Sequence, residues 1–350
     1  MIKYLGSKRL LIPSILETIK TVPNIRTVSD VFSGTSRVGH ALKKSKFRVL
    51  SNDYCEFAST LARCYVEADD ILTSDVEKLI KELNGVQGSA GYFTETFCVK
   101  SHFFQAKNGE RVDAIREEIE KKSLDEPLKS VLLTSLMEAA DRVDSTCGIQ
   151  MAYVKSWSKR SYNPLELRVP HLLQQSPHGP SKAYCMDANT FVKSHEFQEV
   201  DAVYLDPPYN QHSYLGNYHI WETLVKWDKP EHYGKACKRA ECKVKKSKFN
   251  SKKGYFETFK DLISNINAKL IVVSFNNEGY LKPEQIVDVL RTKGTVCIRQ
   301  TPYKRYVGAQ LGQHNPLGER VSEISHLKNI EYTFYVSDDS DVVSALNQSS

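Results

Sequence analysis

The chain has 350 residues, of which 41% are hydrophobic, and its 48 basic side chains exceed the 42 acidic ones. This length predicts one large domain, or one domain with a substantial insertion, and the apolar fraction is enough for a core. The weak positive charge permits a polyanionic partner without requiring one. No run of about 18 apolar residues is present, and the N-terminal stretch carries charges, so neither a membrane span nor a signal peptide is expected.

The eight cysteines are scattered, and none forms a C-x-x-C pair. In a chain of this length that pattern indicates reduced thiols and a cytoplasmic protein. His232, Cys237 and Cys242 have poor spacing for metal ligands, so no metal site is predicted.

The N-terminal stretch Tyr4-Leu5-Gly6-Ser7-Lys8 precedes an amphipathic helix predicted over residues 10–19. Gly6 and Ser7 make a turn whose N–H groups and hydroxyl can face an anion, and Lys8 can meet a carboxylate. A plain helix cap explains the same residues, so this stretch alone leaves both interpretations open.

A strand–turn–helix unit follows, with a strand over 27–32, a tight turn over 33–36 and a helix over 38–44. Gly34 allows a ligand to approach the backbone, while the full G-x-G-x-x-G pattern of dinucleotide enzymes is missing. The next strand, 47–51, leads to Asp53, which stands 19 residues after Gly34. A carboxylate at that place can accept hydrogen bonds from ribose hydroxyls.

After a helix over 55–68, strand and helix stop alternating. We predict that residues 70–181 form a mostly helical insertion, with helices over 75–84, 110–122 and 126–143. Its last part mixes aromatic side chains with basic ones, which suits contact with nucleic acid, although a helical cap on the sheet is an equal alternative. The basic candidates in this part are Lys155, Lys159, Arg160 and Arg168.

A short strand over 182–186 is followed by Asp187 and Ala188, and a strand over 200–205 is followed by Asp206-Pro207-Pro208-Tyr209. The two prolines stiffen the loop because they fix φ twice and remove two N–H donors. The Asp206 carboxylate and the proline carbonyls can accept hydrogen bonds from an amine, and Tyr209 offers a ring for stacking. These residues predict a pocket for a planar group that carries an amine.

The rest of the chain completes the sheet with strands over 269–274, 296–300 and 330–336, and adds helices over 217–227, 255–266 and 283–292. His219 is interpreted as a packing residue rather than a general base. Residues 235–253 hold nine Lys or Arg against one acid, and they include Lys243, Lys245, Lys246 and Lys248. Such a block is typical of phosphate contact, with a solvated loop as the alternative. Residues 274–279 are expected to shape the target pocket, 301–306 to add basic and aromatic groups, and 338–350 to fray.

The stretches KYLGSK, DVFSGTSRVG, DPPY and VVSFNNEGYL occur in this order, and together they resemble the alpha-group DNA adenine-N6 methyltransferases of restriction-modification systems. The resemblance spans nearly the whole chain and departs from the family pattern at Ser36, where a second glycine is common. It implies a Rossmann-like α/β sheet with an inserted target-recognition region. The catalytic domain would comprise 1–69 and 182–340, the insertion 70–181, and the frayed tail 341–350.

The resemblance also implies S-adenosylmethionine as cofactor, double-stranded DNA as substrate, a monomer, and a cognate restriction endonuclease as a candidate partner in a bacterial, archaeal or phage-encoded system. The implied catalytic residues are Asp206, Pro207, Pro208 and Tyr209. The implied cofactor-binding residues are Tyr4, Gly6, Ser7, Lys8, Asp30, Phe32, Ser33, Gly34, Thr35, Ser36, Asp53, Asp187, Ala188 and Asp206.

Other functions stay open at this point. Methylation of the cytosine N4 amine uses a similar pocket, although its signature usually begins with Ser. RNA and protein-glutamine methylation are further alternatives, and the glutamine enzymes typically begin the motif with Asn. A catalytically inactive DNA-binding module on the same fold is the alternative from another class. Carbon methylation of cytosine is set aside, because no cysteine lies in residues 206–218 to act as the nucleophile.

Overall fold

The computed structural model describes residues 1–304 and 328–348, and within them seven strands form one sheet in the order β3-β2-β1-β4-β7-β9-β8. The strands are β1 Thr27–Asp30, β2 Arg48–Asp53, β3 Lys182–Cys185, β4 Ala202–Leu205, β7 Leu270–Asn276, β8 Thr295–Lys304 and β9 Lys328–Ser337. Strands β3, β2, β1, β4 and β7 run parallel to one another, and β9 runs antiparallel to both β7 and β8. The predicted Rossmann-like α/β sheet is confirmed.

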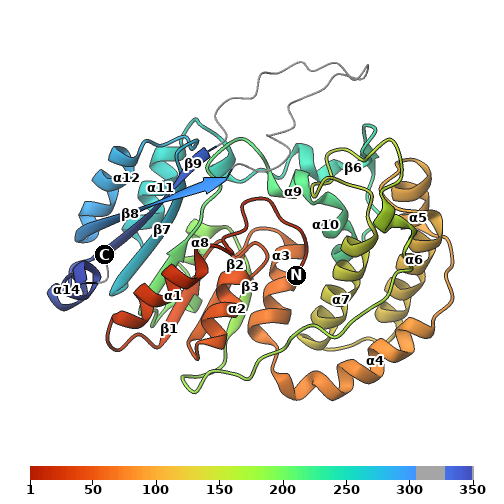
Figure 1. Cartoon of the computed structure of the whole chain (residues 1–350), viewed down its shortest axis with the longest axis horizontal. Helices are drawn as coiled ribbons and strands as arrows, with labels where there is room; N and C mark the ends of the chain where they lie inside the picture. The colour runs from red at the N-terminus through yellow and green to blue at the C-terminus, as the bar shows by residue number, and fades with distance from the viewer. Residues whose placement is uncertain (305–327, 349–350) are drawn as a thin grey trace.

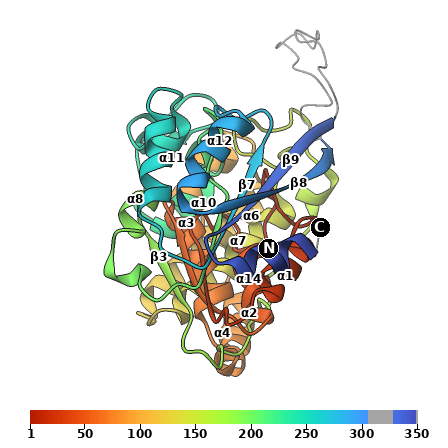
Figure 2. The same cartoon turned by 90° about the vertical axis from the view of Figure 1, so that its left-hand side faces the viewer.

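Both faces of the sheet are covered at its centre, which explains why β4 and β7 read as nearly continuous apolar runs. Val203 and Leu205 belong to the core on one face, and Ala202 and Tyr204 to the core on the other. Figure 2 shows α8, α11 and α12 on the first face and α1, α2 and α14 on the second. These helices are α1 Ile12–Thr21, α2 Arg37–Lys44, α8 Ala188–Phe191, α11 Tyr255–Ser264, α12 Pro283–Leu290 and α14 Ser340–Gln348.

The expectation that residues 338–350 fray is wrong for most of that stretch, because residues 340–348 form the helix α14. Val342 and Leu346, one helical turn apart, are each 1% exposed and pack into the core beneath α1 and α2. This i, i+4 apolar pair anchors the helix to the core.

A helical layer lies beside the sheet, in the right half of Figure 1. It is built from segments that precede β3 in the sequence and segments that follow β4, and these segments share one hydrophobic core. Its helices are α3 Glu56–Ala62, α4 Thr73–Gly85, α5 Tyr92–Thr94, α6 Ala106–Lys121, α7 Leu128–Val143, α9 Tyr214–Asn217 and α10 His219–Lys226. The layer therefore extends beyond the 70–181 insertion. No helix in the described ranges is long and apolar enough to cross a membrane.

The helices of the insertion lie within residues 70–143, and residues 144–181, all of which the structure describes, hold only the 3-10 turn Lys159–Tyr162. These residues run as an extended segment across the helices, with Leu165, Leu167 and Leu172 buried against them. Asn84 and Asn108 satisfy its backbone: Leu167 N donates to Asn84 Oδ1 at 2.9 Å, and Leu165 N donates to Asn108 Oδ1 at 3.0 Å. The amide side chains of the helices thus supply hydrogen bonds that a helical backbone would have made itself.

Short elements complete the chain. The hairpin of β5 His232–Tyr233 and β6 Lys238–Arg239 leads into the basic stretch 235–253, which continues through the 3-10 turns Ala240–Lys243 and Lys248–Asn250. Wider π-type turns span Arg63–Glu67 and Glu95–Val99, and other 3-10 turns span Asp70–Leu72, Lys159–Tyr162, His195–Phe197 and Arg291–Lys293.

Candidate active site

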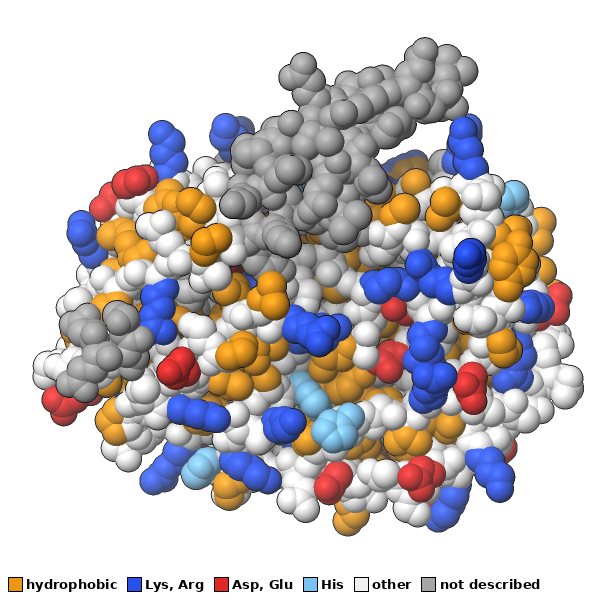
Figure 3. Space-filling model, viewed as in Figure 1, with side chains coloured by type: hydrophobic (Ala, Val, Ile, Leu, Met, Phe, Trp, Pro, Cys, Tyr) orange, Lys and Arg blue, Asp and Glu red, His pale blue; other side chains and the backbone are white. Residues whose placement is uncertain are grey.

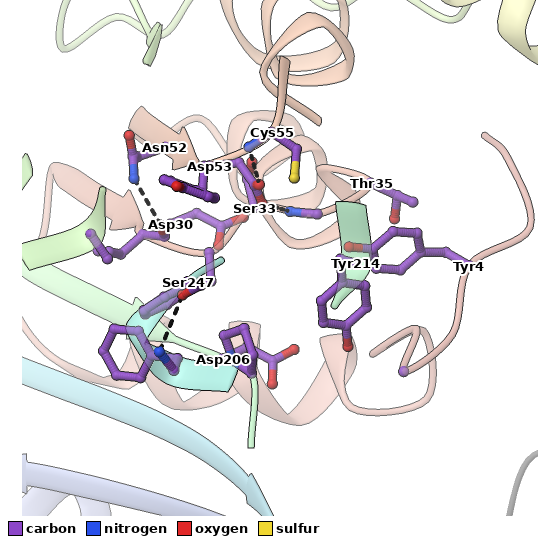
Figure 4. Close-up of a pocket in the computed structure, with 18 of the residues that line it drawn as sticks. Tyr4, Asp30, Ser33, Thr35, Asn52, Asp53, Cys55, Asp206, Tyr214 and Ser247 are labelled. Atoms are coloured by element: carbon purple, nitrogen blue, oxygen red, sulfur yellow. Dashed lines mark hydrogen bonds between the residues drawn. The ribbon is translucent and has the colours of Figure 1, made fainter. Parts of the chain in front are cut away.

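The carboxyl ends of four neighbouring parallel strands meet at one pocket, as the order of the sheet requires. Asp30 ends β1, Asp53 ends β2, Asp187 follows β3 and Asp206 follows β4. All four line a pocket of about 990 Å³, a volume that includes the solvent at its mouth. Figure 4 shows Asp30, Asp53 and Asp206 around this space, with the rings of Tyr4 and Tyr214 at one side.

The Asp-Pro-Pro-Tyr loop is held at two of its backbone carbonyls. The Tyr255 hydroxyl donates to the Pro208 carbonyl at 2.8 Å, and Tyr280 N donates to the Tyr209 carbonyl at 2.9 Å. The Tyr209 ring packs edge-on against Phe275, with 6.1 Å between centroids. Asp206 and Pro208 line the pocket, whereas Pro207 is buried behind it and Tyr209 lies outside its lining. The loop is therefore a fixed platform beside the pocket.

Asp206 forms an ion pair with Lys8, whose Nζ lies 3.1 Å from Asp206 Oδ1. The prediction that Lys8 meets a carboxylate is confirmed. Lys8 also pairs with Glu331 on β9, which the sequence pattern did not indicate. Burial raises the pKa of Asp206 to about 6; Lys8 opposes that rise and the charge of Glu331 adds to it. The carboxyl group is thus mostly ionised at neutral pH.

Two other acids hold the turn after β1. Asp53 accepts hydrogen bonds from Gly34 N at 2.9 Å and Cys55 N at 3.0 Å, and Asp30 accepts one from Gly39 N at 3.1 Å. Burial raises the pKa of Asp30 to about 8, with the charge of Asp206 adding to the effect, so Asp30 is mostly neutral at pH 7. Burial also raises the pKa of Asp53, although its backbone donors lower it.

The turn itself leaves polar atoms available to a ligand. Among the described residues, the buried hydroxyls of Ser33 and Ser36 have no hydrogen-bond partner, and Ser33 lines the pocket. Gly34 has φ +51, and a Cβ there would come within 3.2 Å of the Tyr4 ring. An unpaired buried hydroxyl costs free energy unless something bonds to it, so this turn fits a polar ligand.

Of the fourteen predicted cofactor-binding residues, thirteen line the pocket and Ser36 lies just behind it. Asp187 has a second task, because its Oδ1 accepts from Asn189 N at 3.1 Å and Thr190 N at 3.2 Å and so caps α8. Asn52, which was not predicted from the sequence, donates to the carbonyls of Val31 at 3.2 Å and Met186 at 3.1 Å. Its position next to Asp53 at a strand end was the available signal.

The wall opposite the strand ends comes from residues 213–250, and the sequence pattern did not place it there. Tyr4 is sandwiched between Tyr214, at 5.1 Å between ring centroids, and Tyr218, at 4.7 Å. Leu5 N donates to the Tyr218 hydroxyl at 2.6 Å, which fixes the N-terminal stretch against α9 and α10. Lys245, Ser247, Phe249 and Asn250 complete this wall.

The model of one protein family, the D12 class N6 adenine-specific DNA methyltransferases, matches residues 4–289. The chain belongs to this family. Type II methyltransferase M.FokI of Planomicrobium okeanokoites is 32% identical over 96% of this chain, which covers 53% of that protein. Modification methylase StsI of Streptococcus sanguinis is 29% identical over 91% of this chain and is half covered, at 50%. Type II methyltransferase M.NlaIII of Neisseria lactamica is 29% identical over 95% of this chain and is 99% covered.

The predicted DNA-binding residues of this chain fall into two groups. Exposed side chains belong to Lys155, Lys159, Arg168, Lys243, Lys246 and Lys248. Arg168 lies 3.4 Å from Glu166, and Lys243 lies 4.3 Å from the centroid of the Tyr233 ring. On the face drawn in Figure 3, Lys and Arg side chains are interspersed with Asp and Glu. The exposed group stays a prediction for phosphate contact.

Arg160 and Lys245 are less exposed and are engaged in contacts within the protein, and their role in DNA contact stays a prediction. Arg160 lies 2.6 Å from Asp144 Oδ1 and donates to the Thr146 carbonyl at 2.6 Å, so it fixes the start of the extended segment. Lys245 lies over the Tyr54 ring at 4.8 Å and 3.8 Å from the buried Glu222. In sequence, neither differs from its basic neighbours.

Other predicted features also have a place in the structure. His219 is fully buried and its Nε2 is 2.9 Å from the Gln150 carbonyl, so its packing role is confirmed. Burial lowers the pKa of His219 to about 3, which leaves it uncharged. All eight cysteines lie in the described ranges, and no disulfide joins any two of them there. Residues 274–279 lead directly to Tyr280, whose N–H bonds to the Asp-Pro-Pro-Tyr loop. Of residues 301–306, which were expected to add basic and aromatic groups, 305 and 306 lie outside the described residues.

Proposed function

We propose that the chain transfers a methyl group from S-adenosylmethionine to the N6 amine of an adenine flipped out of double-stranded DNA. The observation that carries this proposal is the placement of Asp206, an ionised acceptor on a fixed loop, at the edge of a pocket lined by strand-end acids. The family match supports adenine as the target base. The names of the relatives, which include a modification methylase, support a role in a restriction-modification system.

The pocket residues fit S-adenosylmethionine. Asp53 would accept from the ribose hydroxyls, and Asp187 from the amino group of the cofactor's adenine. The unpaired Ser33 hydroxyl and the turn around Gly34 and Thr35 would meet the methionine portion. Bound S-adenosylmethionine supplies a methyl group on a positively charged sulfur, and transfer to an amine leaves S-adenosylhomocysteine and one proton.

The protein's part in methyl transfer is positioning and electrostatics. The target amine lies inside the duplex, so the base must leave the stack at a cost of a few kcal/mol. Tyr209 would stack on the flipped base, while Asp206 and the Pro207 carbonyl would accept hydrogen bonds from its amine. These bonds aim the nitrogen lone pair at the methyl group, and the carboxylate stabilises the positive charge that develops on nitrogen.

For DNA binding, we propose that the helical insertion 70–181 recognises the target sequence and that the exposed lysines of residues 235–253 contact phosphates. The insertion presents Lys155, Lys159 and Arg168 at the surface. In the basic stretch, Lys243, Lys246 and Lys248 are exposed, whereas Arg239 is buried and pairs with Asp228 and Glu241. The catalytic domain, from 1–69 and 182–340, would carry the cofactor, and the enzyme would act as a monomer in the cytoplasm.

The most direct test in cells is to express the gene in a host that lacks DNA methylation and to sequence the modified bases. The proposal predicts N6-methyladenine within one recognition sequence, and none with the Asp206→Ala variant. Methylated cytosine would favour the N4 alternative. A protein that binds DNA and leaves every base unmodified would support an inactive DNA-binding module.

A further inference from the structure

Lys8 lies between two carboxylates at the catalytic end of the pocket. Its Nζ is 3.1 Å from Asp206 Oδ1 and also pairs with Glu331 Oε1. The side chains of Lys8 and Glu331 are only 9% and 4% exposed, so solvent ions screen these charges weakly. Glu331 comes from β9, and only the antiparallel insertion of β9 beside β7 brings it to the parallel strand ends.

A lone carboxylate paired with a buried ammonium would lose most of its negative potential, and it would be a poorer acceptor for a substrate amine. Here two carboxylates share one ammonium, so the cluster keeps a net negative charge when both acids are ionised. Asn276 holds the second oxygen of Glu331, since its Nδ2 donates to Oε2 at 3.3 Å. Glu331 is therefore fixed on both of its oxygens.

We propose that Glu331 is a positioning residue for methyl transfer: it shares the Lys8 ammonium, so that Lys8 orients the Asp206 carboxylate without neutralising it. The inference rests on the proposed function, because Glu331 can assist methyl transfer only if Asp206 accepts a hydrogen bond from the target amine. It adds a residue from the antiparallel edge of the sheet to a site otherwise built from parallel strand ends.

The other titratable groups that face Asp206 are mostly uncharged, so Lys8 and Glu331 are the groups whose charges act on its carboxylate. Asp30 is mostly neutral at pH 7, because its pKa is raised to about 8 by burial. Burial raises the pKa values of the surrounding tyrosines above their ordinary value, so those side chains stay uncharged. These tyrosines are Tyr204, Tyr209, Tyr214 and Tyr255.

The test compares the pH dependence of the single-turnover methylation rate in the wild type, Glu331→Gln and Lys8→Met. In the wild type the rate should rise as Asp206 ionises, with its acid limb near the pKa of about 6. Glu331→Gln should lower the rate at pH 8 about tenfold, because Lys8 then faces Asp206 alone. Its acid limb should move to lower pH, while that of Lys8→Met should move to higher pH.

Two controls separate this role from simple structural support. Thr333→Val changes a buried residue on the same face of β9, two positions along, and should keep the wild-type rate and acid limb. Cofactor affinity of Glu331→Gln, measured by calorimetry, should stay within about twofold of the wild type. A rate loss with an unmoved acid limb would indicate structural damage and overturn the proposal.

The outcome also separates this inference from the proposed function. If the wild type methylates adenine and Glu331→Gln matches it in rate and acid limb, only the role of Glu331 is wrong. If the wild type methylates no adenine, the proposed function fails. The Asp206 carboxyl carbon can then be titrated directly by ¹³C NMR. A titration midpoint that does not fall in Glu331→Gln overturns the inference independently.

Discussion

The two walls of the pocket are assembled in different ways. One wall consists of strand ends, where Asp30, Asp53, Asp187 and Asp206 each follow a buried apolar run. The other wall consists of Tyr214, Lys245, Ser247, Phe249 and Asn250, which come from a helix, a turn and a loop. The first wall carries the carboxylates that we propose as acceptors for cofactor and amine, and the second, the closing wall, lies across the pocket from them. Chemistry is thus concentrated on the sheet, while enclosure is supplied by long-range packing.

The largest effect is expected on the strand-end wall at Asp206. Asp206→Ala removes the charged acceptor for the amine, and the single-turnover rate should fall by about 10²-fold or more, with cofactor affinity little changed. The matched change on the opposite wall, Ser247→Ala, should alter the rate by less than about threefold. A near-parental rate in Asp206→Ala would remove that residue from the mechanism.

The next effect concerns the cofactor acids. Asp53→Ala and Asp187→Ala each remove a charged acceptor worth about 1.5–3 kcal/mol, so the Kd for S-adenosylmethionine should rise by about 10- to 150-fold. The methylated DNA sequence should stay the same in both variants. Calorimetry measures the affinities, and thermal unfolding checks the loss of the α8 cap in Asp187→Ala. Unchanged affinity in both would contradict the placement of the cofactor along the strand ends.

A smaller effect is expected from the exposed lysines beside the closing wall. Replacing Lys243, Lys246 and Lys248 with Ala should weaken binding to all duplexes alike. It should also reduce the slope of log affinity against log salt by about one unit for each phosphate that the protein no longer neutralises. The measurement is binding to cognate and mismatched duplexes at several salt concentrations. An unchanged slope with an altered site preference would show that these lysines read bases instead.

The smallest effect is expected from Lys245, which is a neighbour of those lysines in sequence but lines the closing wall of the pocket. Lys245→Met removes its cation–π contact with Tyr54, and the Kd for S-adenosylmethionine should rise about two- to fivefold. Its neighbour provides the matched control, because Lys246→Met changes an exposed side chain and should leave cofactor affinity alone. If both variants affect only the salt dependence of DNA binding, Lys245 belongs with the phosphate contacts after all.

The strand-end wall could be predicted because the sequence encodes it locally. Each acid directly follows an apolar run, and parallel pairing brings the ends of neighbouring strands together. The central strands β4 and β7 were readable for a related reason, since burial on both faces makes them almost entirely apolar. Asn52 occupies such a strand end and was overlooked only because its amide has no obvious ligand chemistry.

The closing wall and Glu331 could not be predicted because their positions depend on contacts across the fold. Lys245 reads as one of nine basic residues, and only its packing on Tyr54 and Glu222 sets it apart. Glu331 reaches Lys8 through the antiparallel placement of β9, which its own sequence does not specify. The extended course of residues 144–181 could not be predicted because the hydrogen-bond partners of this segment, Asn84 and Asn108, lie far away in sequence.

The central claim is that this pocket directs methyl transfer to the N6 amine of adenine in duplex DNA. The most direct measurement incubates the purified chain with S-adenosylmethionine and duplex DNA, digests the DNA to nucleosides, and identifies the methylated nucleoside by mass spectrometry. We predict N6-methyldeoxyadenosine with the wild type and a loss of at least about 10²-fold with Asp206→Ala. Methylation on cytosine, or N6-methyldeoxyadenosine formed equally well by Asp206→Ala, would contradict this claim.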